Sequence, residues 1–207
     1  MSLASFTDLK ASIATWTKRS DMTAIIPDLI TLAEARINRA LRTRKQVTRT
    51  QNTSVDSEFV TLPSDFGAAR AARVTTTTPN DFLDFLTPEQ MGDLKATGPT
   101  GDLRAYSIVG GEFWFLPVPT VAATVELVYY AKVPALSDVA TTNWLLTEHP
   151  DVYLWGALME ASIFLEDDEN TQKYAALFAS ALDDIRANSI SDSLAATLTP
   201  SPSAQVV

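Results

Sequence analysis

The segment from Val152 to Leu165 limits the possible folds of this chain more than any other stretch. Its sequence, VYLWGALMEASIFL, contains a single charged residue, Glu160, and places apolar side chains on every side of a helix. A helix of this kind must be covered on nearly every side, so it belongs at the centre of a helical bundle or in an interface. The run is shorter than the ~18 to 20 residues that cross a bilayer. We therefore predict a buried helix and no membrane span.

Amphipathic helices are predicted on both sides of this segment. Ser5 followed by Asp8 fits a capping box, and apolar residues then recur at helical spacing to about Lys18. A second helix, with a proline acceptable in its first turn, is predicted to continue to about Lys45. After the acidic stretch 166–169 a last amphipathic helix is predicted. Together with the apolar segment these helices make a four-helix bundle.

From Val47 the pattern changes to short runs rich in threonine, valine and aromatic residues, which is typical of β-strands. The stretch RAYSIVGGEFWFLPVP predicts a hairpin, because Gly110 and Gly111 can adopt the positive φ angles of a two-residue turn. ATVELVYYAKVP predicts a further strand, and TPEQMGDLK predicts a short helix opened by Thr87 and Pro88. We predict an α+β fold with a helical bundle from residues 1–46 and 144–188, an inserted, mostly antiparallel β domain over residues 47–143, and an extended C-terminal tail over residues 189–207.

The predicted tail, SISDSLAATLTPSPSAQVV, has one charge, two prolines and no sustained hydrophobic period. It offers too little apolar surface to pack as a domain of its own. We predict that it becomes ordered against a partner.

The only histidine, His149, lies between Glu148 and Pro150 and raises the question of catalysis or metal binding. Thr147 is a suitable N-cap, and acids and proline are favoured in a first helical turn, so this stretch predicts the start of a helix. Because there is one histidine and no cysteine, a metal site would depend on carboxylates alone. We predict no catalytic residue, no metal site and no cofactor, in a reducing compartment.

Two other functional classes stay open. A carboxylate-based hydrolase acting on cell wall needs two acids that face each other across a cleft, whereas residues 166–169 are consecutive acids at a helix start. The second alternative is a small-ligand or protein-binding module of non-viral origin. A zymogram distinguishes the first from a structural protein, and the identity of the neighbouring genes distinguishes the second.

The net charge of -9 argues against a protein whose main task is to grip DNA, because that affinity comes from lysine and arginine on phosphates. Six basic residues and one acid lie between Glu34 and Arg49, whereas ten acids and two bases follow from Glu148 onward. Three arginines of the first region are predicted to share one helix face, as a solvated helix end, a subunit ion pair or a phosphate contact. The subunit-interface candidates are Arg36, Arg39, Arg42, Glu166, Asp167, Asp168 and Trp155.

The order of these pieces is similar to that of a known group of proteins. IPDLITLAEARINRALRTR precedes LPSDF, YSIVGGEFWFLPVP and VELVYYAKVPALSD, and TNWLLTEHPDVYLWGALMEASIFLEDDE follows. From about Leu3 to about Asn188 the chain resembles the adaptor, or head-to-tail connector, proteins of tailed bacteriophages. The most specific stretches are EARINRALR and NWLLTEHPDVYLWGALMEA, which are structural and not catalytic signatures.

This resemblance implies a structural virion protein in the neck between capsid and tail, made in the host bacterial cytoplasm. Such adaptors form a ring, a dodecamer, beneath the portal protein and offer their other face to tail or nozzle proteins. DNA would pass through the ring without specific binding, since a negative lumen would not hold it. Helices and the C-terminal segment would dock on the portal. The portal-contact candidates, chosen by position, are Ser189, Leu194, Leu198, Val206 and Val207.

Three features of the sequence agree with a ring. The segment from Val152 to Leu165 has more apolar surface than a small monomer is expected to cover. Opposite charges at the two ends suit head-to-tail neighbours, in which the basic row of one copy meets the acids of the next. A tail that orders on a partner suits docking on the portal.

Overall fold

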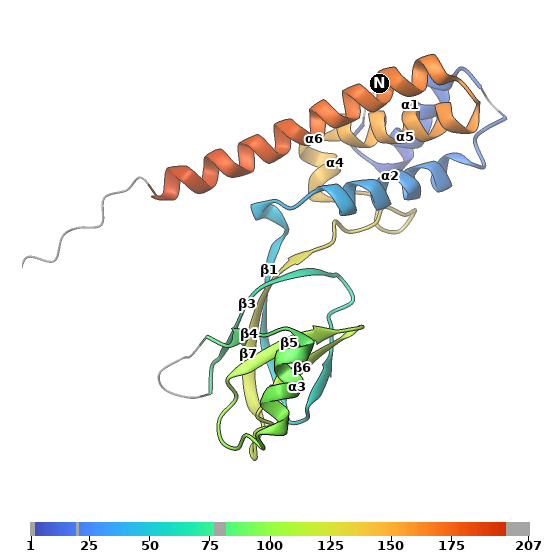
Figure 1. The fold of residues 1–207 in the computed structure, drawn as a ribbon. Coiled ribbons are helices and arrows are strands. Elements are labelled where there is room, and N and C mark those ends of the chain that lie inside the picture. The colour runs from blue at the N-terminus through green and yellow to red at the C-terminus, as the bar shows by residue number, and fades with distance from the viewer. Residues whose placement is uncertain (1–2, 20, 77–81, 198–207) are drawn as a thin grey trace, which may run out of the picture. The chain divides into compact units, whose positions relative to one another are not determined.

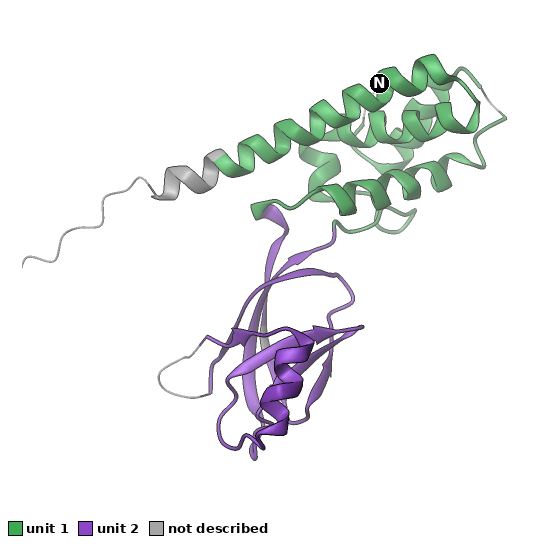
Figure 2. Cartoon of the chain, viewed as in Figure 1, with its two compact units in different colours: residues 1–44, 133–207 green, residues 45–132 purple. Residues whose placement is uncertain are grey.

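The computed structural model describes residues 3–19, 21–76 and 82–197, and the chain forms two compact units (Figure 1). Unit 1 comprises residues 1–44 and 133–207, and unit 2 comprises residues 45–132 (Figure 2). The described part of unit 1 is helical, whereas unit 2 contains the described strands and one described α-helix. The α+β class predicted from the sequence is therefore confirmed.

Unit 1 is built around helix α5 (Pro150–Phe164), which packs against α1 (Phe6–Thr17), α2 (Ile26–Ala40), α4 (Trp144–Glu148) and α6 (Asp168–Thr197) (Figure 1). Within α5, every residue from Val152 to Ser162 except Trp155 is buried. This confirms the predicted buried helix. The cover comes from helices of the same chain, so apart from its last turn α5 does not need a neighbouring copy, and the apolar segment is no argument for a ring.

Close packing around α5 depends on Gly156. A Cβ atom at this position would lie 3.1 Å from Cβ of Ala33 in α2 and 3.1 Å from Cε2 of Phe178 in α6. Both distances are shorter than ordinary van der Waals contacts. The two neighbouring helices thus approach α5 at the position where it has no side chain.

The second helix is shorter than predicted, because α2 ends at Ala40 and a 3-10 helix follows at Arg44–Gln46. Between them Leu41 and Thr43 are buried while Arg42 is exposed. Alternating burial of this kind belongs to extended chain and not to a helix. Arg42 is therefore no longer on the helical face that it was predicted to share.

The predicted start of the first helix is confirmed, whereas the predicted end of the last helix is wrong. Ser5 Oγ accepts a hydrogen bond from Asp8 N at 3.2 Å, which confirms the N-cap of α1. The tail predicted from Ser189 is wrong in its first part, because α6 continues to Thr197. Alanine and leucine in this stretch favour a helix, and the first helix-breaking residue after it is Pro200. Residues 198–207 lie outside the described residues.

The stretch around His149 does contain a helix start, but the capping differs from the prediction. Helix α4 precedes it, and Asn143 Oδ1 accepts from Leu146 N at 2.8 Å as the N-cap. Thr147, the predicted cap, lies inside α4, where its Oγ1 donates to the backbone oxygen of Asn143 at 2.9 Å. Helix α5 then begins at Pro150. His149 joins two helices of one chain.

Residues 133–143 belong to unit 1, although the sequence assigned them to the β domain. Val133 and Leu136 are buried in the helical core. Side chains of α2 hold their backbone, since Val133 N donates to Asn38 Oδ1 and Leu136 N donates to Glu34 Oε1, each at 2.8 Å. Burial raises the pKa of the Glu34 carboxyl above its ordinary value.

Unit 2 contains two sheets. The first is antiparallel, with the order β1-β7-β3, and consists of β1 (Val47–Val55), β7 (Ala123–Ala131) and β3 (Phe66–Val74). The second has the order β2-β6-β5-β4 and consists of β2 (Phe59–Thr61), β6 (Glu112–Leu116), β5 (Ala105–Val109) and β4 (Asp84–Phe85). Among the described strands the β4–β5 pair is parallel and the others are antiparallel, as predicted.

The predicted hairpin and short helix of this unit are both present. Strands β5 and β6 pair around Gly110 and Gly111, and Gly110 has a φ of 62°. Helix α3 (Pro88–Ala96) begins with a capping box, in which Thr87 Oγ1 accepts from Gln90 N and Gln90 Oε1 accepts from Thr87 N. Apolar side chains from both sheets meet in one core.

Candidate interaction surfaces

The predicted arginine row does not act as one group. Arg36 Nε donates to Oε1 of Glu160, so this ion pair joins α2 to α5 within one chain. The side chain of Glu160 is 7% exposed and that of Arg36 is 43% exposed. Without the guanidinium, the carboxylate would be buried and unpaired, which is strongly destabilising. Arg36 therefore stabilises unit 1.

The other two arginines of the row have different surroundings. Arg42 donates through Nη1 to two backbone carbonyls at the C-terminal end of α2, at 2.7 and 2.8 Å. Arg39 is exposed, and within the described residues its side chain has no hydrogen bond or ion pair. Arg186 of α6 lies at the same end, since its Nη2 donates to the backbone oxygen of Ala40 at 2.8 Å. Of the three predicted interface arginines, Arg39 is thus the one whose side chain makes no hydrogen bond or ion pair to another described residue.

The predicted acidic residues lie in the turn between α5 and α6. This turn is a Schellman motif, in which Glu166 N donates to Ile163 O at 3.2 Å and Asp167 N donates to Ser162 O at 3.0 Å. Glu166 has a φ of 56°, a conformation that favours glycine. Asp167 is the cap of α6, and its hydrogen bonds from Asn170 lower the pKa of its carboxyl.

Apolar side chains stand beside these acids. Ile163 is 47% exposed and Phe164 is 55% exposed, in the last turn of α5. Glu166, Asp168 and Glu169 are exposed, and none of them has an ion pair to another described residue. We call these five residues the acidic corner. Exposed apolar groups rimmed by charge are typical of surfaces that bind other proteins.

Trp155 belongs to an aromatic row across three helices. Its ring makes an edge contact with Trp16 of α1, with centroids 5.4 Å apart, and stacks on Tyr174 of α6 at 6.1 Å. Lys173 Nζ lies 5.7 Å from the centre of the Tyr174 ring. Trp16 is 42% exposed. The row leaves aromatic area accessible, and the place of Trp155 in a subunit interface stays a prediction.

The predicted portal contacts fall partly within the described chain. Ser189 Oγ accepts a hydrogen bond from Arg44 N at 3.1 Å, so Ser189 is tied to unit 1. Leu194 lies in α6. Leu198, Val206 and Val207 lie outside the described residues. The portal contact of this segment stays a prediction.

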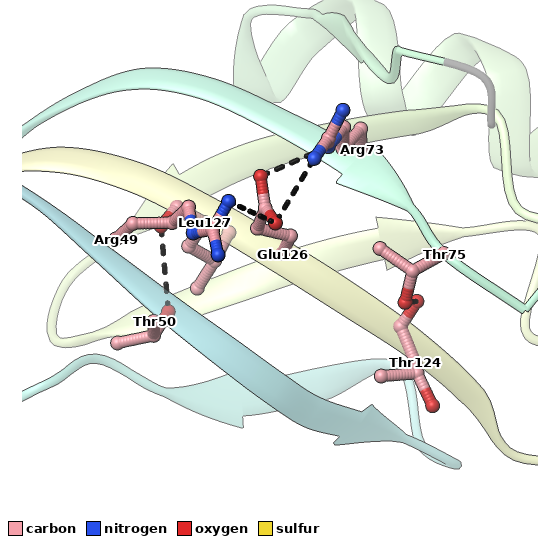
Figure 3. A network of polar contacts seen from close by, with 7 residues as sticks. All are labelled: Arg49, Thr50, Arg73, Thr75, Thr124, Glu126 and Leu127. Atoms are coloured by element: carbon pink, nitrogen blue, oxygen red, sulfur yellow. Dashed lines mark hydrogen bonds and ion pairs between the residues drawn. The ribbon is translucent and has the colours of Figure 1, made fainter.

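Unit 2 carries a charged group that the sequence did not single out (Figure 3). Glu126 in the middle strand β7 accepts from Arg73 of β3 at 2.9 and 3.1 Å, and Arg49 of β1 lies 3.5 Å away on its other side. The hydrogen bonds from Arg73 and the charges of both arginines lower the pKa of the Glu126 carboxyl. We call Arg49, Glu126 and Arg73 the arginine ladder. Strand alternation placed Glu126 on one face, but only the strand register shows which arginines flank it.

A pocket of about 240 Å³ lies beside the arginine ladder. Its walls are Ala71, Phe82 and Val128, and Arg73 and Glu126 complete the lining. Phe82 is 71% exposed and leaves the pocket open to solvent. We call this the sheet pocket. Small-molecule sites usually measure about 300 to 1,000 Å³, so its size suits a single protein side chain better.

The described residues hold no cluster of three or more His, Cys, Asp or Glu side chains arranged to bind a metal ion. In that same part of the chain, the helices are too short or too polar to cross a bilayer. What stands out on both units is charged and aromatic side chains on the surface. Exposed apolar and charged groups of this kind are typical of surfaces that bind other proteins.

Comparison with known families identifies the class of assembly. The family model described as SU10 adaptor protein matches residues 4–201, and the chain belongs to this family. It is a structural adaptor protein of a bacteriophage, which confirms the resemblance inferred from EARINRALR and NWLLTEHPDVYLWGALMEA. A comparison with curated proteins found no match.

Proposed function

We propose that this adaptor forms a ring in the phage neck, links the portal of the capsid to the tail, and leaves a channel for DNA. The observation that carries the proposal is the match to the adaptor family over residues 4–201. Membership in a family of structural adaptors also supports a role without catalysis.

The charge distribution of unit 1 supports head-to-tail neighbours in such a ring. The acidic corner lies at the N-terminal end of α6, and Arg186 contacts the end of α2 that carries Arg39. From Asp168 to Arg186 a helix rises about 27 Å at ~1.5 Å per residue. Arg186 is itself paired with Asp183 at 2.6 Å, so the positive charge of that end, opposite to the charge of the acidic corner, comes from Arg39 and Arg42. In a closed ring of head-to-tail neighbours, the acidic end of each copy can face a basic surface of the next copy.

The C-terminal segment is proposed to bind the portal. Ser189 is hydrogen-bonded to Arg44 within unit 1, whereas Ile190 is 61% exposed. Deletion of residues 190–207 keeps Ser189 and should leave unit 1 folded while weakening portal binding. Equal portal binding by the shortened chain, measured by surface plasmon resonance, contradicts this part of the proposal.

Electron microscopy of the purified protein with the portal protein of the same phage tests the ring itself. We expect closed rings coaxial with the portal, and class averages give the number of copies, which the resemblance puts at twelve. A protein that stays monomeric at every concentration, with and without the portal, contradicts the proposal.

A further inference from the structure

The acidic corner and the sheet pocket have complementary chemistry. The corner presents two exposed apolar side chains followed by three carboxylates without ion pairs to described residues. The pocket presents apolar walls beside the arginine ladder, whose side chains Arg49 and Arg73 are 50% and 33% exposed. Two arginines and one glutamate leave the ladder with an excess positive charge. Apolar surface therefore meets apolar surface, and negative charge meets positive charge.

We propose that the acidic corner of one copy docks on the arginine ladder of the next copy, with Phe164 in the sheet pocket. This inference rests on the proposed ring. The occupant is a second copy because one chain carries both surfaces, and contact between two different surfaces of identical chains repeats around an axis. An aromatic anchor in a pocket, rimmed by charge pairs, is the usual centre of a protein interface.

The carboxylate of Glu166 is exposed and is available to a partner. The residue holds a φ of 56° at the position of a Schellman motif where glycine is strongly preferred. Within the described residues its carboxylate has no hydrogen bond or ion pair to compensate for this strain.

The basic row of α2 is the weaker partner because no apolar pocket lies beside it within the described residues, whereas the ladder places two partly exposed arginines beside the sheet pocket. Arg36 is paired with Glu160, and Arg42 is bonded to backbone carbonyls of α2. Arg39 is then the row's single unengaged arginine within the described chain, and it is the competing partner for the acids.

Cross-linking tests the contact directly, because the chain contains no cysteine. Ile163→Cys and Ala71→Cys are made separately, mixed in the presence of the portal protein, and treated with a short bis-maleimide. Docking predicts a covalent dimer in the mixture that neither variant forms alone. Val139→Cys, at a residue 96% exposed in unit 1, replaces Ile163→Cys as the matched control and should give no dimer with Ala71→Cys. A dimer of Ile163→Cys with Arg39→Cys in place of Ala71→Cys overturns the proposal.

Charge variants then test the ion pairs. Glu166→Gln with Asp168→Asn should reduce the cross-link yield several-fold, and added salt should act in the same direction. Asp28→Asn, an exposed acid in the first turn of α2, is the control and should leave the yield unchanged. A yield that is insensitive to Glu166→Gln and Asp168→Asn overturns the role given to the corner.

The failure of the docking and the failure of the ring are distinguishable. Rings visible by electron microscopy without a cross-link above the Val139→Cys control would falsify the docking and leave the ring intact. A protein that stays monomeric and forms no cross-link contradicts both the docking and the ring.

Discussion

Arg36 and Arg39 lie about one turn apart on α2. The structure predicts that Arg36 contributes to the free energy of unfolding and that Arg39 does not. Arg36→Met leaves the Glu160 carboxylate, 7% exposed, without its guanidinium. Breaking a fully buried ion pair costs about 3 to 5 kcal/mol. Because Arg36 is 43% exposed and water reaches the site, we expect a loss of about 2 kcal/mol. Arg39→Met removes an exposed side chain and should change the free energy of unfolding by less than about 0.5 kcal/mol.

Urea unfolding followed by tryptophan fluorescence measures these losses, because Trp16, Trp144 and Trp155, three of the four tryptophans, lie in unit 1. A cycle of Arg36→Met, Glu160→Met and the double variant isolates the pair. The double variant should lie close to the parent protein, since removing both partners leaves no buried charge. Equal losses for Arg36→Met and Arg39→Met, or no coupling in the cycle, would refute the reasoning.

This difference changes how the predicted subunit pairing is tested. Reversing all three arginines would place a glutamate at position 36 beside Glu160 and unfold unit 1, so lost assembly would be uninformative. Arg39→Glu alone avoids this. If the basic row lies at a subunit boundary, Arg39→Glu should weaken ring formation and leave the urea midpoint unchanged. Unaltered ring formation by Arg39→Glu would contradict the prediction that the basic row lies at a subunit boundary.

Three further predictions concern single sites. Glu166→Gly should raise the free energy of unfolding by about 1 kcal/mol, because glycine adopts positive φ without steric cost, and an unchanged urea midpoint contradicts this. Gly156→Ala should lower it by about 1 kcal/mol, since close contacts with Ala33 and Phe178 outweigh the gain in helix propensity; greater urea resistance contradicts this. Folding raises the pKa of the Glu34 carboxyl above its ordinary value of 4.5. The contribution of Glu34 to stability is therefore lost as the pH rises through the folded-state pKa. Glu34→Gln should make the urea midpoint fall less steeply with pH in this region.

The elements whose signals are local could be predicted from the sequence. The N-cap of α1 at Ser5, the capping box of α3 at Thr87 and the turn at Gly110 each depend on residues within a few positions of one another. The burial of α5 followed from its composition alone, because no side of the helix is polar enough to face water. The sequence also carried enough of the family pattern to identify a phage adaptor.

The ends of the helices and the pairing of charges depend on how distant parts of the chain pack. Helix α2 ends at Ala40 because Leu41 enters the core in extended chain, a fact set by the packing around it. The Arg36–Glu160 and Arg73–Glu126 pairs join residues 124 and 53 positions apart. Their partners depend on how two helices pack and on the register of three strands. A local pattern shows only on which face of a helix or strand a side chain lies. The residue that it contacts on that face comes from a distant part of the chain.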